Sequence, residues 1–128
     1  MRVLLADDQI SVRSALRLLL EQEPSFQVVG ETADASGLLL AVVEKAPDLI
    51  LLDWELPGLP AVQLLRLLLY ERPSLKIIAM SSRPEAKQAL LAGAHAFLSK
   101  SEPPDQVLAI VQSLLKKGSE ENEANIVS

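Results

Sequence analysis

The segment LILLDWELPG, residues 49–58, contains four large apolar residues in a row that end at Asp53. A run that is apolar at every position is typical of a strand buried on both faces of a parallel sheet. Pro57 and Gly58 then predict a turn, so we expect Asp53 at the carboxyl end of this strand. In open α/β sheets, ligands bind in the crevice outside these strand ends. A single carboxylate there could equally be a helix cap or a solvated loop residue.

Three other apolar runs also end in polar residues. Residues 2–6 (RVLLA) precede Asp7-Asp8, residues 76–80 (KIIAM) precede Ser81-Ser82, and residues 96–99 (AFLS) precede Lys100. If these strands are parallel and adjacent, one edge of the sheet gathers three carboxylates, a hydroxyl and an ammonium group.

Strand-like and helix-like segments alternate along the whole chain. A further strand is expected over residues 26–30, and helices are expected over 10–23, 35–46, 59–71, 84–92 and 104–117. Five β-then-α units with short connections predict an α/β fold, a doubly wound (βα)5 parallel sheet with helices on both faces. We expect the flavodoxin-like strand order 2-1-3-4-5, which places Asp7, Asp8 and Asp53 at one switch point.

The 128 residues are enough for one domain, which we expect over residues 1–117. Residues 118–128 (GSEENEANIVS) are polar and acidic, and are expected to be a flexible tail or linker that begins at Gly118. Leu40, Leu64 and Leu67 fall off the inward stripes expected for their helices, and could together mark an association surface.

The composition excludes several classes of protein. The chain has no cysteine, which removes disulfides and thiolate metal sites and fits a reducing cytoplasm. We find no signal peptide, and no apolar run approaches the roughly 20 residues of a membrane span. The net charge of −5 argues against direct nucleic-acid binding, because phosphate contacts need clustered Lys and Arg.

The expected group of side chains suits phosphoryl chemistry. Three carboxylates repel one another and favour a hard divalent cation such as Mg²⁺, which prefers oxygen ligands. Asp53 follows the most buried strand and is the best nucleophile, since carboxylates accept phosphoryl groups as acyl phosphates. Lys100 would pair with the phosphoryl oxygens, and the Ser81 hydroxyl would donate a hydrogen bond to one of them. Taken singly, Asp7-Asp8 could simply cap the first helix.

Taken together, Asp7-Asp8, Asp53 with Leu56-Pro57-Gly58, Ser81 and Lys100 resemble a bacterial response-regulator receiver domain over about residues 1–117. No one of these motifs is specific, but their order at the ends of these strands is. The resemblance implies that Asp53 is the phosphoacceptor. It further implies Mg²⁺ ligation by Asp53, by Asp8 directly, by Asp7 through water and by the backbone carbonyl of Glu55.

The resemblance also implies the parts of a switch. Ser81 corresponds to the switch hydroxyl, Phe97 to the switch aromatic and Lys100 to the phosphate-pairing lysine. Two positions depart from the family pattern: Ser101 stands where many relatives carry a proline, and Pro60-Ala61 where many carry Asp-Gly.

We therefore expect a switch that catalyses only its own phosphorylation and dephosphorylation, with a cognate histidine kinase or a small phosphodonor as partner. The Val28-Val29-Gly30-Glu31 strand resembles receivers of LuxR-type regulators, which carry a C-terminal DNA-binding domain and could form homodimers. One alternative is an aspartyl-phosphate phosphohydrolase, although the second aspartate of that class is Glu55 here. Another is a degenerate receiver that serves only for docking.

Three neighbouring side chains complete the expectations. Trp54 should lie at the rim of the crevice, partly exposed, with its indole on the other side of the strand from the Asp53 carboxylate. Glu55 and Arg83 should pair across the crevice mouth. His95, the single histidine, should be a solvated surface residue.

Overall fold

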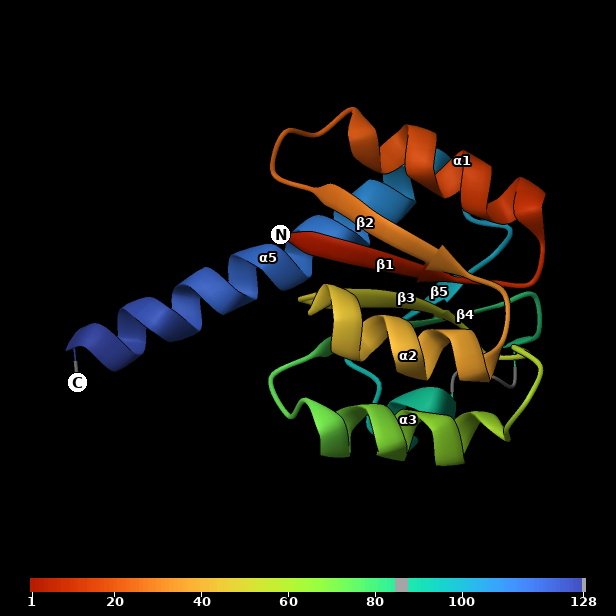
Figure 1. Ribbon diagram of the computed structural model, residues 1–128. Coiled ribbons are helices and arrows are strands. Elements are labelled where there is room, and N and C mark those ends of the chain that lie inside the picture. Colours follow the sequence, from red (N-terminus) through yellow and green to blue (C-terminus); the bar gives the residue numbers. More distant parts are fainter. Residues whose placement is uncertain (85–87, 128) are drawn as a thin grey trace.

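The computed structural model describes residues 1–84 and 88–127, with side chains described as far as residue 115. Its centre is one parallel sheet of five strands in the order β2-β1-β3-β4-β5 (Figure 1). The strands are β1 (Arg2–Ala6), β2 (Gln27–Thr32), β3 (Leu49–Asp53), β4 (Lys76–Ser81) and β5 (Ala96–Ser99). The fold class and strand order predicted from the sequence are confirmed.

Five helices cover the two faces of the sheet (Figure 1). They are α1 (Ile10–Glu21), α2 (Ala35–Lys45), α3 (Ala61–Glu71), α4 (Ala89–Ala92) and α5 (Pro104–Val127). One core cluster joins the sheet to α2, α3 and α4, and a second joins it to α1 and α5. Within the described residues, no helix combines the length and the apolar character that crossing a bilayer requires.

The continuous apolar run of β3 is explained by this two-sided packing. Ile50 and Leu52 lie in the cluster with α2 and α3, whereas Leu49 and Leu51 lie in the cluster with α1 and α5. All four side chains are fully buried. A strand with alternating polar residues would leave one of these helix layers without a partner surface.

Helix α3 corrects one expectation. Leu64 is core, together with Leu65 and Leu68, so it belongs to no association surface. Apolar residues occur on most sides of this helix, so the sequence alone is compatible with more than one choice of buried face. Leu40 and Leu67 are exposed, as expected.

Helix α5 gives a second correction, because it continues to Val127 instead of ending at Gly118. A glycine inside a helix costs only about 1 kcal/mol relative to alanine, and no proline follows it. The glutamates and alanine of residues 120–124 favour helix, so this single weak breaker does not end it. Two other bounds differ from the expectation. Of the expected helix 84–92, α4 is described over Ala89–Ala92 and residues 85–87 lie outside the described residues, while β2 extends to Thr32.

The loop after Asp53 is fastened to the start of α2. The Ala35 N–H donates a hydrogen bond to the Pro57 carbonyl over 2.9 Å. Gly58 has φ +118°, and a Cβ built on it would lie 2.9 Å from the Ala35 Cβ. This loop therefore requires glycine at residue 58 both for its backbone conformation and for its close approach to α2.

We predict that Gly58→Ala destabilises the protein more than Gly93→Ala. Gly93 has nearly the same φ, +119°, but a Cβ there would meet nothing closer than 3.6 Å. Both substitutions carry a backbone cost of roughly 1–3 kcal/mol, and only Gly58→Ala adds a clash with the α2 backbone and Ala35. Urea denaturation of the two variants measures the difference, and equal losses of stability would contradict the packing argument.

Candidate functional site

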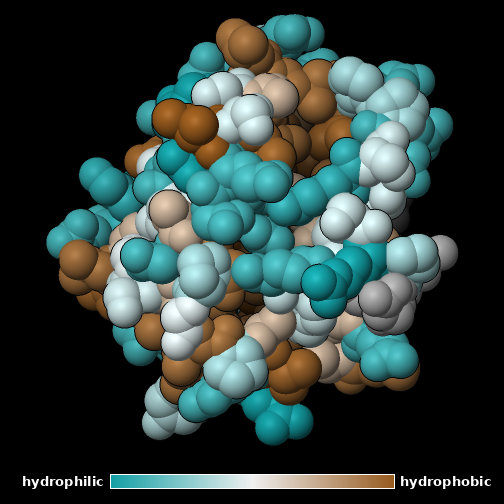
Figure 2. Space-filling model, turned by 90° about the vertical axis from the view of Figure 1, so that its right-hand side faces the viewer, coloured by the Kyte–Doolittle hydropathy of each residue, from teal (hydrophilic) through white to brown (hydrophobic). Residues whose placement is uncertain are grey.

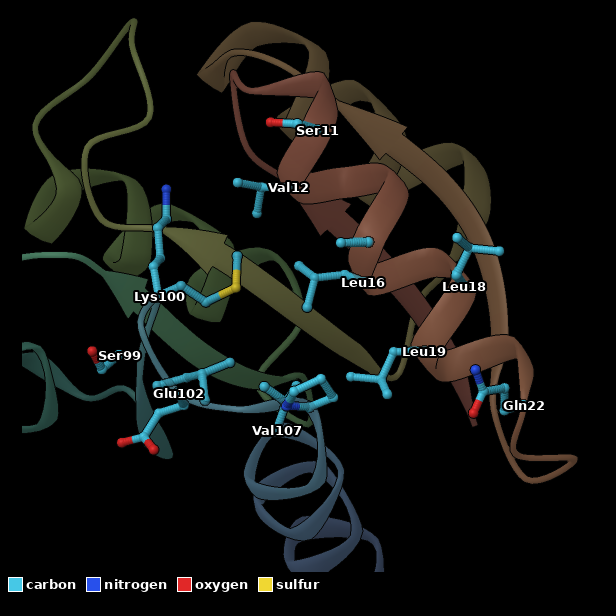
Figure 3. A pocket seen from close by; sticks show the side chains of 14 residues that line it. Ser11, Val12, Leu16, Leu18, Leu19, Gln22, Ser99, Lys100, Glu102 and Val107 are labelled. Atoms are coloured by element: carbon cyan, nitrogen blue, oxygen red, sulfur yellow. The ribbon is translucent and has the colours of Figure 1, made fainter.

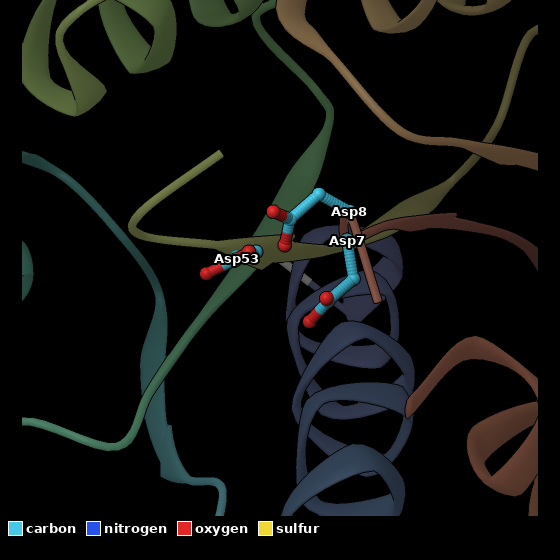
Figure 4. Close-up of side chains that lie close together, drawn as sticks. All are labelled: Asp7, Asp8 and Asp53. Atoms are coloured by element: carbon cyan, nitrogen blue, oxygen red, sulfur yellow. The ribbon is translucent and has the colours of Figure 1, made fainter. Parts of the chain in front are cut away.

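Three carboxylates meet at the edge where the parallel strands end. Asp7, Asp8 and Asp53 each offer an oxygen, and these oxygens all lie within 4.8 Å of one another (Figure 4). Asp7 and Asp53 are 0% and 2% exposed, whereas Asp8 is open to solvent. Figure 2 shows this side of the molecule, with hydrophilic side chains across its centre and apolar ones above and below. The sequence-based grouping of these three residues is therefore observed.

Backbone hydrogen bonds hold the two buried carboxylates. Asp53 Oδ1 accepts from the Glu55 N–H over 3.0 Å, and the Trp54 N–H donates to the Met80 carbonyl over 2.8 Å. Asp7 Oδ1 accepts from the Gln9 N–H over 2.8 Å. Each carboxylate is thus oriented by the loop that follows it, through one of its two oxygens.

Lys100 supplies the positive charge of the site. Its Nζ lies 2.8 Å from Asp7 Oδ2 and 3.3 Å from Asp53 Oδ1. The Lys100 N–H donates to the Ser81 carbonyl over 2.9 Å, which ties the loop after β5 to the end of β4. The ammonium group therefore bridges strands β1 and β3, as the positions of these residues in the sequence predict.

Burial and charge shift the protonation of this group. Burial raises the pKa of Asp53, and the negative charge of Asp7 adds to it, while the Glu55 N–H and Lys100 act in the opposite direction. Burial alone would lower the pKa of Lys100, but its contact with Asp7 and the charge of Asp53 outweigh this and raise it. The protonated, positively charged form of Lys100 is therefore favoured. The ionised form of Asp53 is less favourable than that of an aspartate in water.

The donor set fits a magnesium ion. Asp7 Oδ2 is buried and, apart from its ion-pair contact with Lys100, has no hydrogen-bond partner among the described residues. Three closely spaced carboxylate oxygens without nitrogen or sulfur ligands are the kind of site that Mg²⁺ prefers. An exposed Asp8 leaves room for the waters that such an ion retains.

Ser81 makes a contact that sequence reasoning did not anticipate. Its fully buried hydroxyl donates a hydrogen bond to Glu55 Oε1 over 2.6 Å and accepts one from the Arg83 N–H over 3.0 Å. The expected pairing of Glu55 with Arg83 is present, with 3.8 Å between Nε and Oε1. Ser81 ends β4 and Glu55 lies just beyond the end of β3, but which acceptor a hydroxyl selects depends on side-chain torsions that the sequence does not reveal.

Arg13 is a second residue that sequence reasoning did not place at the site. One of its terminal nitrogens donates to the Asp7 carbonyl over 2.6 Å, and its Nε contacts Glu31 over 3.0 Å. Arg17 holds the other oxygen of Glu31 over 2.8 Å. Arg13 follows Asp7 by six residues, near the start of α1, and this spacing is the signal in the sequence that could have predicted the hydrogen bond to the Asp7 carbonyl.

The remaining expected residues lie as follows. Phe97 is partly buried against the core cluster on the α2–α3 side, and Trp54 is half-buried beside that same cluster. His95 is an exposed surface residue, as expected, and its Nδ1 also accepts a hydrogen bond from the Ile77 N–H over 3.0 Å, which the sequence did not predict. His95 thus joins the starts of β4 and β5, away from the strand ends that carry the carboxylates.

A groove of about 570 Å³ lies beside the site, with α1 on one side and the start of α5 on the other (Figure 3). Its walls are mostly apolar, and Leu18 remains 68% exposed there. Lys100 borders this groove while its ammonium group contacts the carboxylates. The groove and the acidic crevice therefore share one residue but differ in chemistry.

Comparison with known proteins gives a family match over most of the chain. Residues 3–112 match the model of the response regulator receiver domain. The chain is 31% identical over 111 residues to the uncharacterized transcriptional regulatory protein YhcZ of Bacillus subtilis, covering 84% of this chain and 52% of that protein. It is 36% identical over 119 residues to a protein-glutamate methylesterase/protein-glutamine glutaminase of Myxococcus xanthus, covering 90% of this chain and 34% of that protein.

Among solved structures, a LuxR-family two-component response regulator from Aurantimonas sp. superposes with a TM-score of 0.83 at 28% identity, covering 91% of this chain and 85% of that one. The present chain spans about half the length of the first curated relative and about a third of the second. The match over residues 3–112, a range that includes the three carboxylates and Lys100, shows that the chain belongs to the response regulator receiver domains, and it is related to the LuxR-type regulators.

Proposed function

We propose that Asp53 is the phosphoacceptor of this receiver domain. The observation that carries the proposal is a nearly fully buried carboxylate, hydrogen-bonded on one oxygen, with Lys100 3.3 Å away and two further carboxylates beside it. An Asp53 oxygen attacks the phosphorus of the donor, a P–O bond to Asp53 forms, and the donor's bond to phosphorus breaks with its electrons leaving on the donor. Water later attacks the same phosphorus, releases phosphate and restores the carboxylate.

The other residues position and neutralise this group. Lys100 pairs with a phosphoryl oxygen, and Ser81 donates a hydrogen bond to another. Asp7, Asp8, Asp53 and the Glu55 carbonyl would hold Mg²⁺, Asp8 as a direct ligand and Asp7 through water. Bound Mg²⁺ would supply positive charge for the transferring oxygens.

The proposed output is signalling. The chain acts on no substrate other than its own Asp53, receives the phosphoryl group from a cognate histidine kinase or a small phosphodonor, and resides in the cytoplasm, as a cysteine-free sequence favours. Inward movement of Phe97 transmits the change at Ser81, and phosphorylation favours homodimers. Regulation of transcription through a DNA-binding domain in a longer protein is supported by the relation to LuxR-type regulators.

We predict that acetyl phosphate modifies the protein on Asp53 only when Mg²⁺ is present, because the acidic crevice must be neutralised before an anionic donor enters. Intact-protein mass spectrometry should show a gain of about 80 Da, the mass of one phosphoryl group. Asp53→Asn is the control, and an equal gain on this variant would refute the assignment.

Trp54 provides a reporter of metal binding. Mg²⁺ should change its fluorescence, because the indole follows Asp53 directly and lies half-buried beside the site. Asp8→Ala should abolish this response, whereas Glu44→Ala, an exposed carboxylate on α2, should leave it unchanged. A full response in the Asp8→Ala variant would overturn the metal assignment.

We also predict that Asp53→Asn stabilises the metal-free protein at pH 7. The pKa of Asp53 is raised, so the folded state binds this proton more tightly than the unfolded chain does. The contribution of this carboxyl group to stability is complete below its ordinary pKa and declines as the pH rises through the raised value. The gain in urea midpoint should therefore disappear at acid pH, and it should exceed that of Asp8→Asn, which removes the same charge from an exposed position. A pH-independent gain would contradict this account.

A further inference from the structure

The hydroxyl of Ser81 has one proton, and the structure commits that proton to Glu55. The distance of 2.6 Å from Ser81 Oγ to Glu55 Oε1 is that of a hydrogen bond from a hydroxyl to a charged carboxylate, which is shorter and stronger than a neutral one. Ser81 is fully buried, so no bulk water is available to replace this acceptor. The Arg83 N–H already occupies an acceptor site on the same oxygen.

A phosphoryl group on Asp53 competes for the same proton. Its oxygens need the Ser81 hydroxyl as a donor, and while the bond to Glu55 persists that donor is unavailable. The carboxylate of Glu55 is also a negative charge at the mouth of a crevice that must admit an anion. Both effects oppose the phosphorylated state and are relieved when the Glu55 side chain moves away.

The ion pair with Arg83 does not hold this arrangement by itself. It spans 3.8 Å, and the two side chains are 69% and 36% exposed. Exposed pairs of this kind contribute little free energy. The hydrogen bond to the buried hydroxyl is therefore the contact that keeps Glu55 in place.

We propose that the Glu55 side chain is a latch: a positioning residue that holds the Ser81 hydroxyl in the resting state and sets how readily Asp53 takes and keeps a phosphoryl group. This assigns the side chain a role separate from that of the Glu55 backbone carbonyl as a metal ligand. The inference rests on the proposed function, because it concerns regulation of the same site.

The test uses beryllofluoride, a phosphoryl mimic, with the full chain in excess Mg²⁺ and with bound fluoride measured by ¹⁹F NMR. Glu55→Ala should bind it about tenfold more tightly than the wild type, a factor within the worth of a hydrogen bond to a charged group. Glu55→Gln, which keeps a weaker neutral acceptor, should gain less. Glu102→Gln removes a charge two residues beyond Lys100 and serves as the matched control; it should bind as the wild type does.

Ser81→Ala separates the latch from a general effect of charge. In that background Glu55→Ala should gain clearly less affinity than in the wild-type background, because only the repulsion by the Glu55 charge is left to relieve. An equal gain in both backgrounds, or no gain in the wild-type background, would overturn the proposal.

A second measurement needs neither metal nor mimic. The urea midpoints of Glu55→Ala, Ser81→Ala and the double variant should be non-additive, because the second substitution removes a contact that the first has already broken. If the wild type binds no beryllofluoride on Asp53, the proposed function fails and the regulatory role falls with it, while non-additive midpoints still show the contact. Additive midpoints would show that the Ser81–Glu55 contact does not contribute to stability, and would overturn the proposal.

Discussion

Two buried neighbouring carboxylates, Asp7 and Asp53, depend on the ammonium group of Lys100 to offset their negative charge. Asp7 and Asp53 are almost completely removed from water, and Lys100 is the one cation within ion-pair distance of either among the residues that the structure describes. Burial of unpaired charges costs several kcal/mol per ion, and like charges in a medium of low dielectric constant add to it. The loop between β5 and α5 must therefore place Lys100 next to these carboxylates. The hydrogen bond from the Lys100 N–H to the Ser81 carbonyl holds the backbone in that position.

A parallel sheet is what makes such a meeting possible. Asp7, Asp53, Ser81 and Lys100 come from four strands, and only parallel strands bring all four carboxyl ends to one edge. The sheet must then be covered on both faces, because every connection is a crossover helix. The unbroken apolar run of β3 is therefore a condition of the chemistry as well as of the fold, since it lies between both helix layers and ends at Asp53.

The same reasoning explains what the sequence predicted and what it did not. Strand ends, their order and the gathering of Asp7, Asp8, Asp53 and Lys100 follow from hydrophobic runs that stop at polar residues. The inward face of α3 did not follow, because leucines surround that helix, and Gly118 failed as a helix end because helix-forming residues continue beyond it. The Ser81–Glu55 bond and the Nδ1 contact of His95 depend on distances between side chains that no sequence period encodes.

The charge of the site predicts an order in which the proposed ligands would bind. Three carboxylates against one ammonium leave two negative charges in excess, and Glu55 places another at the mouth. This field disfavours a dianionic phosphoryl group until a divalent cation offsets the excess, so the proposed function predicts that metal binding would precede phosphoryl binding. Cancelling the inner charges does not remove that of Glu55, whose ion-pair partner among the described residues is the exposed Arg83. On the proposed mechanism, an arriving phosphoryl group would both repel this carboxylate and compete for the Ser81 hydroxyl that it holds, so repulsion and the exchange of one hydrogen bond would act in the same direction.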